Sequence, residues 1–324
     1  MQTLQIRYVL SLLIVTTLLS CNQAPKQQAE PTASAETESS VKLSLAQWSL
    51  HRAIRSGEMS PYDFAEKAHE MGFQGLEYVN QLYTDVVRAE DKKAAVAAFV
   101  EKNNELAAQY GLQNVLIMID GEGSLSTSDA TSRAEAIENH KLWIDAAADM
   151  GCSAVRLNLY GEKDPELWTS NSIESLSALS AYAAPKGINV LVENHGRISS
   201  NAAALMGVIN GVNAPNCGTL PDFGNFCIAE EGYGSVFDGS CTEVYDIYQG
   251  VEEMMPKAMA LSAKSNDFDE NGDETFIDYE RMLRIAKSAG YDGFIGVEYE
   301  GSRLSEIEGI KATRDLLIKA SASL

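Results

Sequence analysis

Three carboxylate side chains follow apolar segments of the sequence and would together suit a hard metal ion. Glu193 ends the run INVLVE, Asp222 lies in GTLPDF, and Glu298 lies near the end of GFIGVEYE. A buried apolar strand that ends in a carboxylate indicates that its end faces something other than the core. Carboxylates that meet in a partly dry pocket repel one another unless a divalent cation is present. Their oxygen atoms favour Mg²⁺ or Mn²⁺, with Zn²⁺ as the alternative.

The same residues predict proton chemistry on a bound carbonyl compound. A divalent ion chelated by a carbonyl and its neighbouring hydroxyl acidifies the carbon between them. Glu193 and Glu298 are therefore the predicted acid–base residues. Lys264 is also predicted to be catalytic, because its ammonium group could polarise a carbonyl or take up a proton. The alternative for Lys264 is a salt bridge to Asp222 or Glu298.

A second interpretation of the carboxylates requires no metal. Ion-pair networks also gather at the ends of strands. In that case the three carboxylates pair with the basic side chains of Lys264, Arg156 and Arg197. Both interpretations stay open at the level of the sequence.

The elements that must position these residues follow one repeated pattern, in which short apolar segments alternate with longer segments of helical periodicity. The expected strands are residues 42–48, 75–79, 114–119, 154–160, 188–194, 218–223, 258–265 and 293–300. The expected helices are residues 61–71, 92–110, 132–150, 172–185, 200–209, 243–255, 278–289 and 309–320. Glycines that would end helices precede five of the strands, at Gly72, Gly111, Gly151, Gly187 and Gly290. This α/β pattern predicts a (β/α)₈ TIM barrel, with a doubly wound open sheet as the alternative.

In a TIM barrel, the carboxyl ends of the strands meet on one face, so residues far apart in sequence surround one cavity. The expected strands end at or beside Trp48, Glu77, Asp120, Asn158, Glu193, Asp222, Lys264 and Glu298.

Four motifs give the chain a resemblance to a known family. The segments VENHG, LPDFGN, SAKSNDFD and GVEYEG resemble those of the xylose-isomerase-like barrels, from LAQWSLH to the last helix. That family includes sugar isomerases, ketose 3-epimerases, inosose dehydratases and endonucleases of the endonuclease IV type. The resemblance implies metal ligands at Glu193, Asp222, Ser262 and Glu298. Ser262 stands where the family has a histidine, and Asn225 stands where the family has a second one.

Substrate-binding residues are expected around the same face. His195 lies two residues after Glu193, on the same side of an extended strand, and could supply the missing nitrogen. Its alternative role is to hydrogen-bond the backbone of its own loop. The remaining candidates are His51 in the first loop, Trp48 as a stacking surface, Glu77 as a partner for a hydroxyl, and Asn225.

The resemblance implies a metal-dependent sugar isomerase or epimerase that removes a proton next to a metal-chelated carbonyl. Returning the proton to the other face gives epimerisation, moving it to the next carbon gives isomerisation, and losing a β-substituent gives elimination. Two alternatives stay open, namely a 3-keto-glycoside lyase or hydratase on the same scaffold, and a carbohydrate-binding lipoprotein without catalysis. The DNA-repair activity is excluded because its three-zinc site needs many histidines and the chain has four.

The N-terminal residues predict an exported bacterial lipoprotein, in the periplasm or anchored at the outer membrane. Residues 1–20 read as a signal peptide, and the sequence LLSC resembles a lipobox with Cys21 as the lipidated residue. Residues 21–40 read as a flexible tether, and residues 41–324 as the barrel. The lipid anchor is the expected membrane contact, and the sequence leaves the oligomeric state open.

Charge and cysteine content limit the partners further. The net charge of −21 argues against nucleic acid, which leaves a small-molecule carbohydrate as the expected partner. One disulfide is expected among Cys217, Cys227 and Cys241. Residues 267–278 resemble an EF-hand calcium loop, although ENGD within them is also a good tight turn.

Overall fold

The computed structural model describes residues 41–229, 234–237, 239 and 241–324, which belong to one compact unit. The predicted signal peptide, the tether and the lipidated Cys21 lie outside the described residues. In the described part of the chain, no helix is long and apolar enough to cross a membrane.

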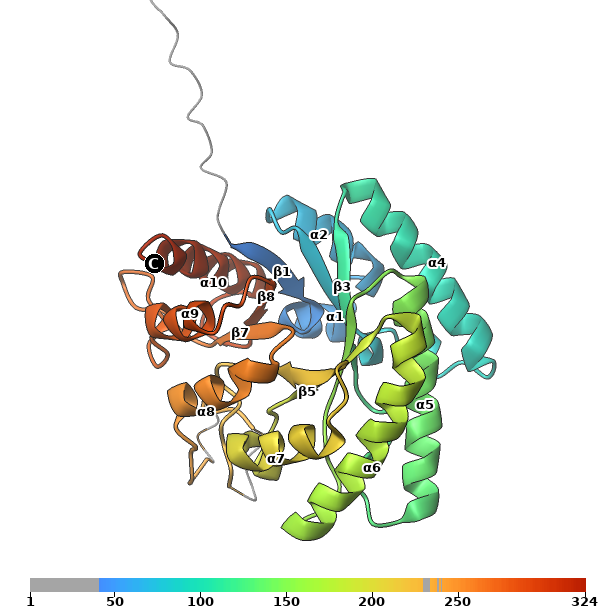
Figure 1. Ribbon diagram of the computed structural model, residues 1–324. Helices are drawn as coiled ribbons and strands as arrows, with labels where there is room; N and C mark the ends of the chain where they lie inside the picture. Colours follow the sequence, from blue (N-terminus) through green and yellow to red (C-terminus); the bar gives the residue numbers. More distant parts are fainter. Residues whose placement is uncertain (1–40, 230–233, 238, 240) are drawn as a thin grey trace, which may run out of the picture. The chain divides into compact units, whose positions relative to one another are not determined.

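Eight parallel strands form the centre of the molecule (Figure 1), in the order β6-β5-β4-β3-β2-β1-β8-β7. They are β1 (Lys42–Ala46), β2 (Gly75–Val79), β3 (Gln113–Ile119), β4 (Ala154–Leu157), β5 (Asn189–Glu193), β6 (Cys217–Leu220), β7 (Leu261–Ser265) and β8 (Phe294–Tyr299). Two isolated parallel bridges, Thr219 to Ala258 and Asp222 to Ser262, join the regions of β6 and β7 and close the ring. The predicted (β/α)₈ barrel is therefore confirmed.

The helices surround the strands (Figure 1). They are α1 (His51–Ser56), α2 (Phe64–Glu70), α3 (Thr84–Val87), α4 (Lys92–Tyr110), α5 (Ala130–Asp149), α6 (Pro165–Ala183), α7 (Ala202–Val212), α8 (Ile247–Met254), α9 (Tyr279–Ser288) and α10 (Glu306–Ser321). All five glycines that were expected to end helices have a positive φ, from 67° at Gly111 to 79° at Gly290. Residues with a side chain rarely adopt this conformation, so these helix ends are encoded locally. The short helices α1 and α3 were not predicted.

The strands are buried against both the helices and the barrel interior. β2 has no exposed residue, and β3 and β5 are buried except at or near their first residue. A strand covered on both faces needs a continuous apolar sequence, which explains why these strands could be recognised without alternation. The polar residues on the strands are therefore informative, and four of those with charged side chains, Arg156, Glu193, Lys264 and Glu298, lie at or next to the carboxyl end of a strand.

Two smaller features bear on alternatives that the sequence left open. Cys227 and Cys241 form a disulfide, with a Cα–Cα distance of 5.8 Å, and Cys217 is a buried free thiol. In the loop 267–278, Asp269 accepts hydrogen bonds from the backbone of Asn271 and Asp273, and Asp278 caps α9. These acidic side chains stabilise a turn and a helix start, so their contacts fit the tight-turn interpretation of this loop.

Candidate active site

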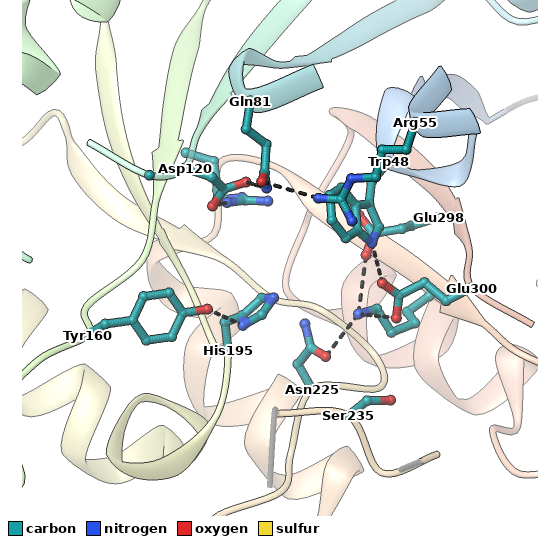
Figure 2. A pocket seen from close by; sticks show the side chains of 13 residues that line it. Trp48, Arg55, Gln81, Asp120, Tyr160, His195, Asn225, Ser235, Glu298 and Glu300 are labelled. Carbon is teal, nitrogen blue, oxygen red and sulfur yellow. Dashed lines mark hydrogen bonds and ion pairs between the residues drawn. The ribbon is translucent and has the colours of Figure 1, made fainter. Parts of the chain in front are cut away.

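A cavity of about 480 Å³ opens at the carboxyl ends of the strands (Figure 2). Its walls are polar and carry both charges. The lining residues are Trp48, Arg55, Gln81, Asp120, Gly121, Arg156, Tyr160, His195, Asn225, Ser235, Lys264, Glu298 and Glu300. Five of the residues predicted from sequence to be functional are therefore in the cavity wall: Trp48, His195, Asn225, Lys264 and Glu298.

The three predicted metal-binding carboxylates lie together at this face. Glu193, Asp222 and Glu298 each place an oxygen within 4.8 Å of the others, and all three are buried. Glu298, with 4% of its surface exposed, lines the cavity, whereas Glu193 and Asp222, with 2% and 0% exposed, are not among the lining residues. The cluster therefore has one member that a ligand in the cavity can touch directly.

Both oxygens of Glu193 have partners within the protein. Asn225 Nδ2 donates to Oε1 at 3.0 Å, and Arg156 Nε lies 2.8 Å from Oε2 as an ion pair. Burial raises the pKa of Glu193, although the positive charges of Arg156 and Lys264 oppose this shift. Asn225 and Arg156 thus cover Glu193, and they limit the access of a cavity ligand to this predicted second acid–base residue.

Asp222 is the carboxylate with the weakest charge compensation. It accepts hydrogen bonds from Ser262 Oγ at 2.5 Å and from the backbone of Gly224 at 2.9 Å. Among the described residues, no basic side chain is within ion-pair distance of it. Burial raises the pKa of Asp222 to about 6, despite the opposing charge of Lys264. A neutral or cation-bound state is therefore favoured at this position.

We expect Asp222→Asn to stabilise the metal-free protein while weakening the binding of Mn²⁺. The folded-state pKa of about 6 lies above the ordinary 3.8, so the folded state retains a proton that the unfolded state has released. Stability of the metal-free protein should consequently fall as the pH rises from 3.8 to 6, and the penalty should persist above pH 6. The neutral amide removes that penalty, which we expect to be about 1–3 kcal/mol at pH 7.

Urea unfolding at pH 5 and pH 7, with EDTA and with Mn²⁺, measures both effects of Asp222→Asn. The control is Asp315→Asn on α10, whose carboxylate is largely exposed and pairs with Arg314. A metal-free Asp222→Asn protein that is less stable than the parent at pH 7 would contradict the argument.

Lys264 is a buried ammonium group at the base of the cavity. Its Nζ donates to Asn225 Oδ1 at 2.9 Å and lies 3.2 Å from Glu298 Oε1 and 3.0 Å from Glu300 Oε2. Burial alone would lower its pKa, but the surrounding carboxylates, led by Glu300, raise it well above the ordinary value. Lys264 is therefore charged at neutral pH, which suits it to polarise a carbonyl rather than to take up a proton. The salt bridge to Glu298 that was considered as an alternative is also present.

Glu300 is a cavity residue that the sequence interpretation missed. It accepts a hydrogen bond from Trp48 Nε1 and pairs with Lys264, and despite burial its pKa is lowered to about 2, mainly by the charge of Lys264. It is thus ionised at neutral pH and fixes both neighbours. A signal was available, because Glu300 lies two residues after Glu298 and so points to the same side of an extended chain.

His195 lines the wall across from Glu298 (Figure 2), and its Nδ1 is bonded to the Tyr160 hydroxyl. Burial lowers the pKa of His195 to about 4, and the charges of Lys264 and Arg156 act in the same direction. Burial also raises the pKa of Tyr160, so its hydroxyl keeps its proton and donates to Nδ1. The hydrogen of the neutral imidazole is then on Nε2, where it can be donated to a ligand oxygen.

Another part of the cavity wall consists of Asp120, Gln81 and Arg156. Arg156 Nη1 donates to Asp120 Oδ1 at 2.9 Å, and Gln81 Nε2 donates to Oδ2 at 3.2 Å. Arg156 therefore joins Asp120 to Glu193. The ion pair between Arg156 and Glu193, which the ion-pair interpretation expected, is therefore present. Arg156 holds in place both Glu193 at the end of β5 and Asp120, the residue after β3.

Two predicted substrate-binding residues lie elsewhere. Glu77 is fully buried inside the barrel, where Ser44 Oγ donates to it at 2.5 Å and where a Cβ at Gly296 would lie 2.6 Å from its oxygens. His51 stacks on the Trp48 ring at 4.5 Å, and its Nδ1 donates to the Trp48 carbonyl at 2.6 Å. Neither position fits direct contact with a ligand in the cavity. A strand-end position alone did not reveal that Glu77 points below the cavity, or that His51 packs against Trp48.

The donor set at the triad fits a hard divalent ion. It offers buried carboxylate oxygens from Glu193, Asp222 and Glu298, with the Ser262 hydroxyl next to Asp222 and no imidazole or thiolate among them. Three clustered carboxylates without enough positive charge raise one another's proton affinity, and the pKa of Glu298 is raised well above its ordinary value by burial and by its acidic neighbours. A cluster of buried carboxylate oxygens of this kind could hold a divalent metal ion.

Comparisons with known proteins agree with this architecture. The family model described as xylose isomerase-like TIM barrel matches residues 65–320. Among solved structures, 3-keto-D-glucoside 4-epimerase from E. coli superposes with a TM-score of 0.63 at 13% identity, covering 86% of this chain and 99% of that chain. D-Allulose 3-epimerase from Methylomonas sp. gives a TM-score of 0.63 at 15% identity, covering 86% and 98%. The sequence matches no curated protein.

A third solved structure of the same fold contains a metal ion. The IOLI protein, whose structure contains a bound zinc atom, superposes with a TM-score of 0.61 at 15% identity and covers 87% of this chain and 99% of its own. At such identities these structures establish the shared fold.

Proposed function

Because the chain belongs to the xylose isomerase-like TIM barrel family, we propose that it is a divalent-metal-dependent isomerase or epimerase of a small sugar. The single observation that carries this proposal is the buried cluster of Glu193, Asp222 and Glu298 at the base of a polar cavity. The sugar epimerases among the structures of the same fold support the substrate class. The export signal and lipid anchor that the sequence predicts favour a location outside the cytoplasm, and therefore an unphosphorylated sugar as the substrate.

The metal would be held by Glu193, Asp222 and Glu298. When bound, a divalent ion supplies Lewis-acid polarisation of a carbonyl oxygen, which makes the neighbouring C–H more acidic. Glu298 is the triad member in the cavity wall and is the group that removes and returns the proton. Burial and its acidic neighbours raise the pKa of Glu298, which increases its affinity for the proton that it would remove from the sugar.

Other cavity residues position the sugar and stabilise charge on its oxygens. Lys264 presents a permanent positive charge beside Glu298, and His195 presents Nε2–H from the opposite wall. Trp48 is held by its hydrogen bond to Glu300 and, with His51 stacked on its ring and Arg55 over it, adds an aromatic side chain to the cavity wall.

Screening of Glu193 bears on the outcome of the reaction. Epimerisation needs a proton carrier on both faces of the reacting carbon, whereas isomerisation and elimination need one. With Arg156 and Asn225 covering Glu193, one carboxylate of the triad reaches the cavity. Elimination from a 3-keto-glycoside is therefore the second candidate function, and product analysis separates it from isomerisation.

The test begins with metal content and proton exchange. We expect the purified protein to contain close to one Mn²⁺ or Mg²⁺ per chain and the Glu193→Ala variant to contain almost none. Free and 3-keto sugars incubated with the loaded protein in D₂O should acquire deuterium at the carbon next to the carbonyl, as measured by NMR. Sugar binding that is independent of metal, with no exchange on any sugar, would refute the enzyme and leave a carbohydrate-binding protein.

A further inference from the structure

A second cavity of about 230 Å³ borders the active-site cavity. Apolar side chains from separate parts of the chain line it, namely Leu159, Trp168, Ile198 and Ile228. The Trp168 Nε1–H is used by the Leu159 carbonyl at 3.1 Å, so the indole presents no unsatisfied donor there. Charged residues complete the lining, among them Glu162 and Lys163. The second cavity thus combines an apolar surface with charged groups.

Tyr160 separates the two cavities, because it is a lining residue of both of them. It follows β4, on the side of the barrel opposite Glu298 in β8, and 41% of its surface is exposed. Its hydroxyl is bonded to His195, which lines the active-site cavity, while the next residue, Gly196, lines the second cavity. A ligand that extends from one cavity to the other would therefore pass over an exposed aromatic ring.

The wall of the second cavity is held in a fixed position. The backbone N–H of Ile228 donates to the Glu243 carbonyl at 2.9 Å, and its neighbour Cys227 forms both a bridge to Val244 and the disulfide to Cys241. A binding surface that is already ordered loses little conformational entropy when a ligand binds. This cavity is therefore suited to contribute affinity.

A sugar ring has apolar C–H faces and polar edges, which match an apolar surface bordered by charged groups. The active-site cavity differs, because its base consists of Lys264, Glu298 and Glu300 and suits the reacting part of a sugar. We infer that the second cavity binds a second sugar ring, so that the substrate is a disaccharide or a larger glycoside joined across Tyr160. This inference rests on the proposed function for the assignment of the reacting ring, and it adds the substrate class.

Calorimetric titration of the full chain with defined sugars tests the two-ring site. The probes are cellobiose, lactose, maltose, sucrose and trehalose, each compared with its own component monosaccharides in the presence of Mn²⁺. We expect at least one disaccharide to bind ten-fold more tightly than either of its components. Ile228→Trp, which fills the second cavity, should abolish that gain, and Ile198→Trp serves as a second variant if the first does not fold. The control is Ile318→Trp, the same substitution at an exposed position of α10, which should retain the gain.

The outcomes separate this inference from the proposed function. Equal affinity for disaccharides and their components, no binding of any probe, or a gain that survives in both cavity variants would overturn the two-ring site. The same samples are transferred to D₂O for proton exchange. Tighter disaccharide binding without exchange on any sugar would support the two-ring site and refute the isomerase. Exchange together with equal affinities for disaccharides and monosaccharides would support the isomerase and refute the two-ring site.

Discussion

Replacing Glu298 with glutamine should lower kcat by about 10²–10⁴-fold, the usual contribution of a positioned acid–base group. The amide preserves the size of the side chain and its contact with Lys264, but it cannot carry the proton. Glu298 is the one triad carboxylate in the cavity wall, so no other triad member can replace it without rearrangement. The measurement is steady-state turnover of whichever sugar shows deuterium exchange, with metal content determined on the same sample.

Metal content is essential to interpreting Glu298→Gln, because Glu298 is also a proposed ligand. A variant that is reloaded to the parent's metal content and remains inactive has lost proton transfer. The control is Glu105→Gln on α4, an exposed glutamate paired with Lys102, which should leave kcat unchanged. If the metal-loaded Glu298→Gln protein keeps more than half of the parent's kcat, Glu298 is not the acid–base residue.

Replacing Lys264 with methionine should destabilise the protein by about 3–5 kcal/mol at pH 7, because the removal of one partner leaves buried charge uncompensated. Methionine occupies the space of the lysine stem, so the cavity effect is small. The stem is closely packed, since a Cβ at Gly224 would lie 3.0 Å from its Cδ. The groups that lose their cation are Glu298 and Glu300, at 3.2 and 3.0 Å.

The cost of Lys264→Met should depend on pH. The pKa of Glu300 is lowered to about 2 in the folded protein, against an ordinary 4.5. The stabilisation associated with this shift is fully present above pH 4.5 and is lost as the pH falls towards 2. The difference in unfolding free energy between the parent and Lys264→Met should therefore be largest at neutral pH and shrink below pH 4.5.

Urea unfolding of the metal-free proteins from pH 3 to pH 8 checks both the size and the pH dependence. Lys67→Met on α2 is the matched control, because Lys67 forms a surface pair with Glu70 at 2.7 Å. That substitution should cost less than about 1 kcal/mol. A loss for Lys264→Met as small as the control's would show that Lys264 does not compensate the buried carboxylates.

Asp222→Asn and Lys264→Met change the charge balance of the same carboxylate cluster in different ways. Lys264 and Arg156 neutralise part of the acidic cluster, and Asp222 is left without a cation of its own among the described residues. The ion-pair interpretation and the metal interpretation of the carboxylates are thus compatible, because the resident cations do not balance all of the negative charge. Asp222→Asn and Lys264→Met should consequently shift stability in opposite directions.

Several site residues could be assigned from sequence because their positions depend on local rules. An apolar strand that ends in or beside a carboxylate marked Glu193, Asp222 and Glu298, and the barrel pattern brought their ends to one face. Trp48 and Lys264 were found from their strand ends, and His195 from its position two residues after Glu193; all three line the cavity. The resemblance to the xylose-isomerase-like barrels added Ser262, which the structure places in direct contact with Asp222, and Asn225, which lines the cavity.

Other assignments depended on side-chain direction and on contacts between distant strands. Glu77 points into the barrel interior, where Gly296 leaves space for it, and His51 packs on Trp48. Tyr160 reaches His195 across a separation of 35 residues, and Glu300 fixes both Lys264 and Trp48. No local pattern encodes such contacts.

The sequence by itself determined the order of strands and helices, the helix ends at glycine, and the identity of the carboxylates, because periodicity, φ preference and burial act over a few residues. The tertiary structure alone decided which carboxylate reaches the cavity, which cations neutralise the others, and that Tyr160 separates two cavities. Those properties depend on distances between strands that are far apart in the chain, and electrostatic and packing energies depend on those distances.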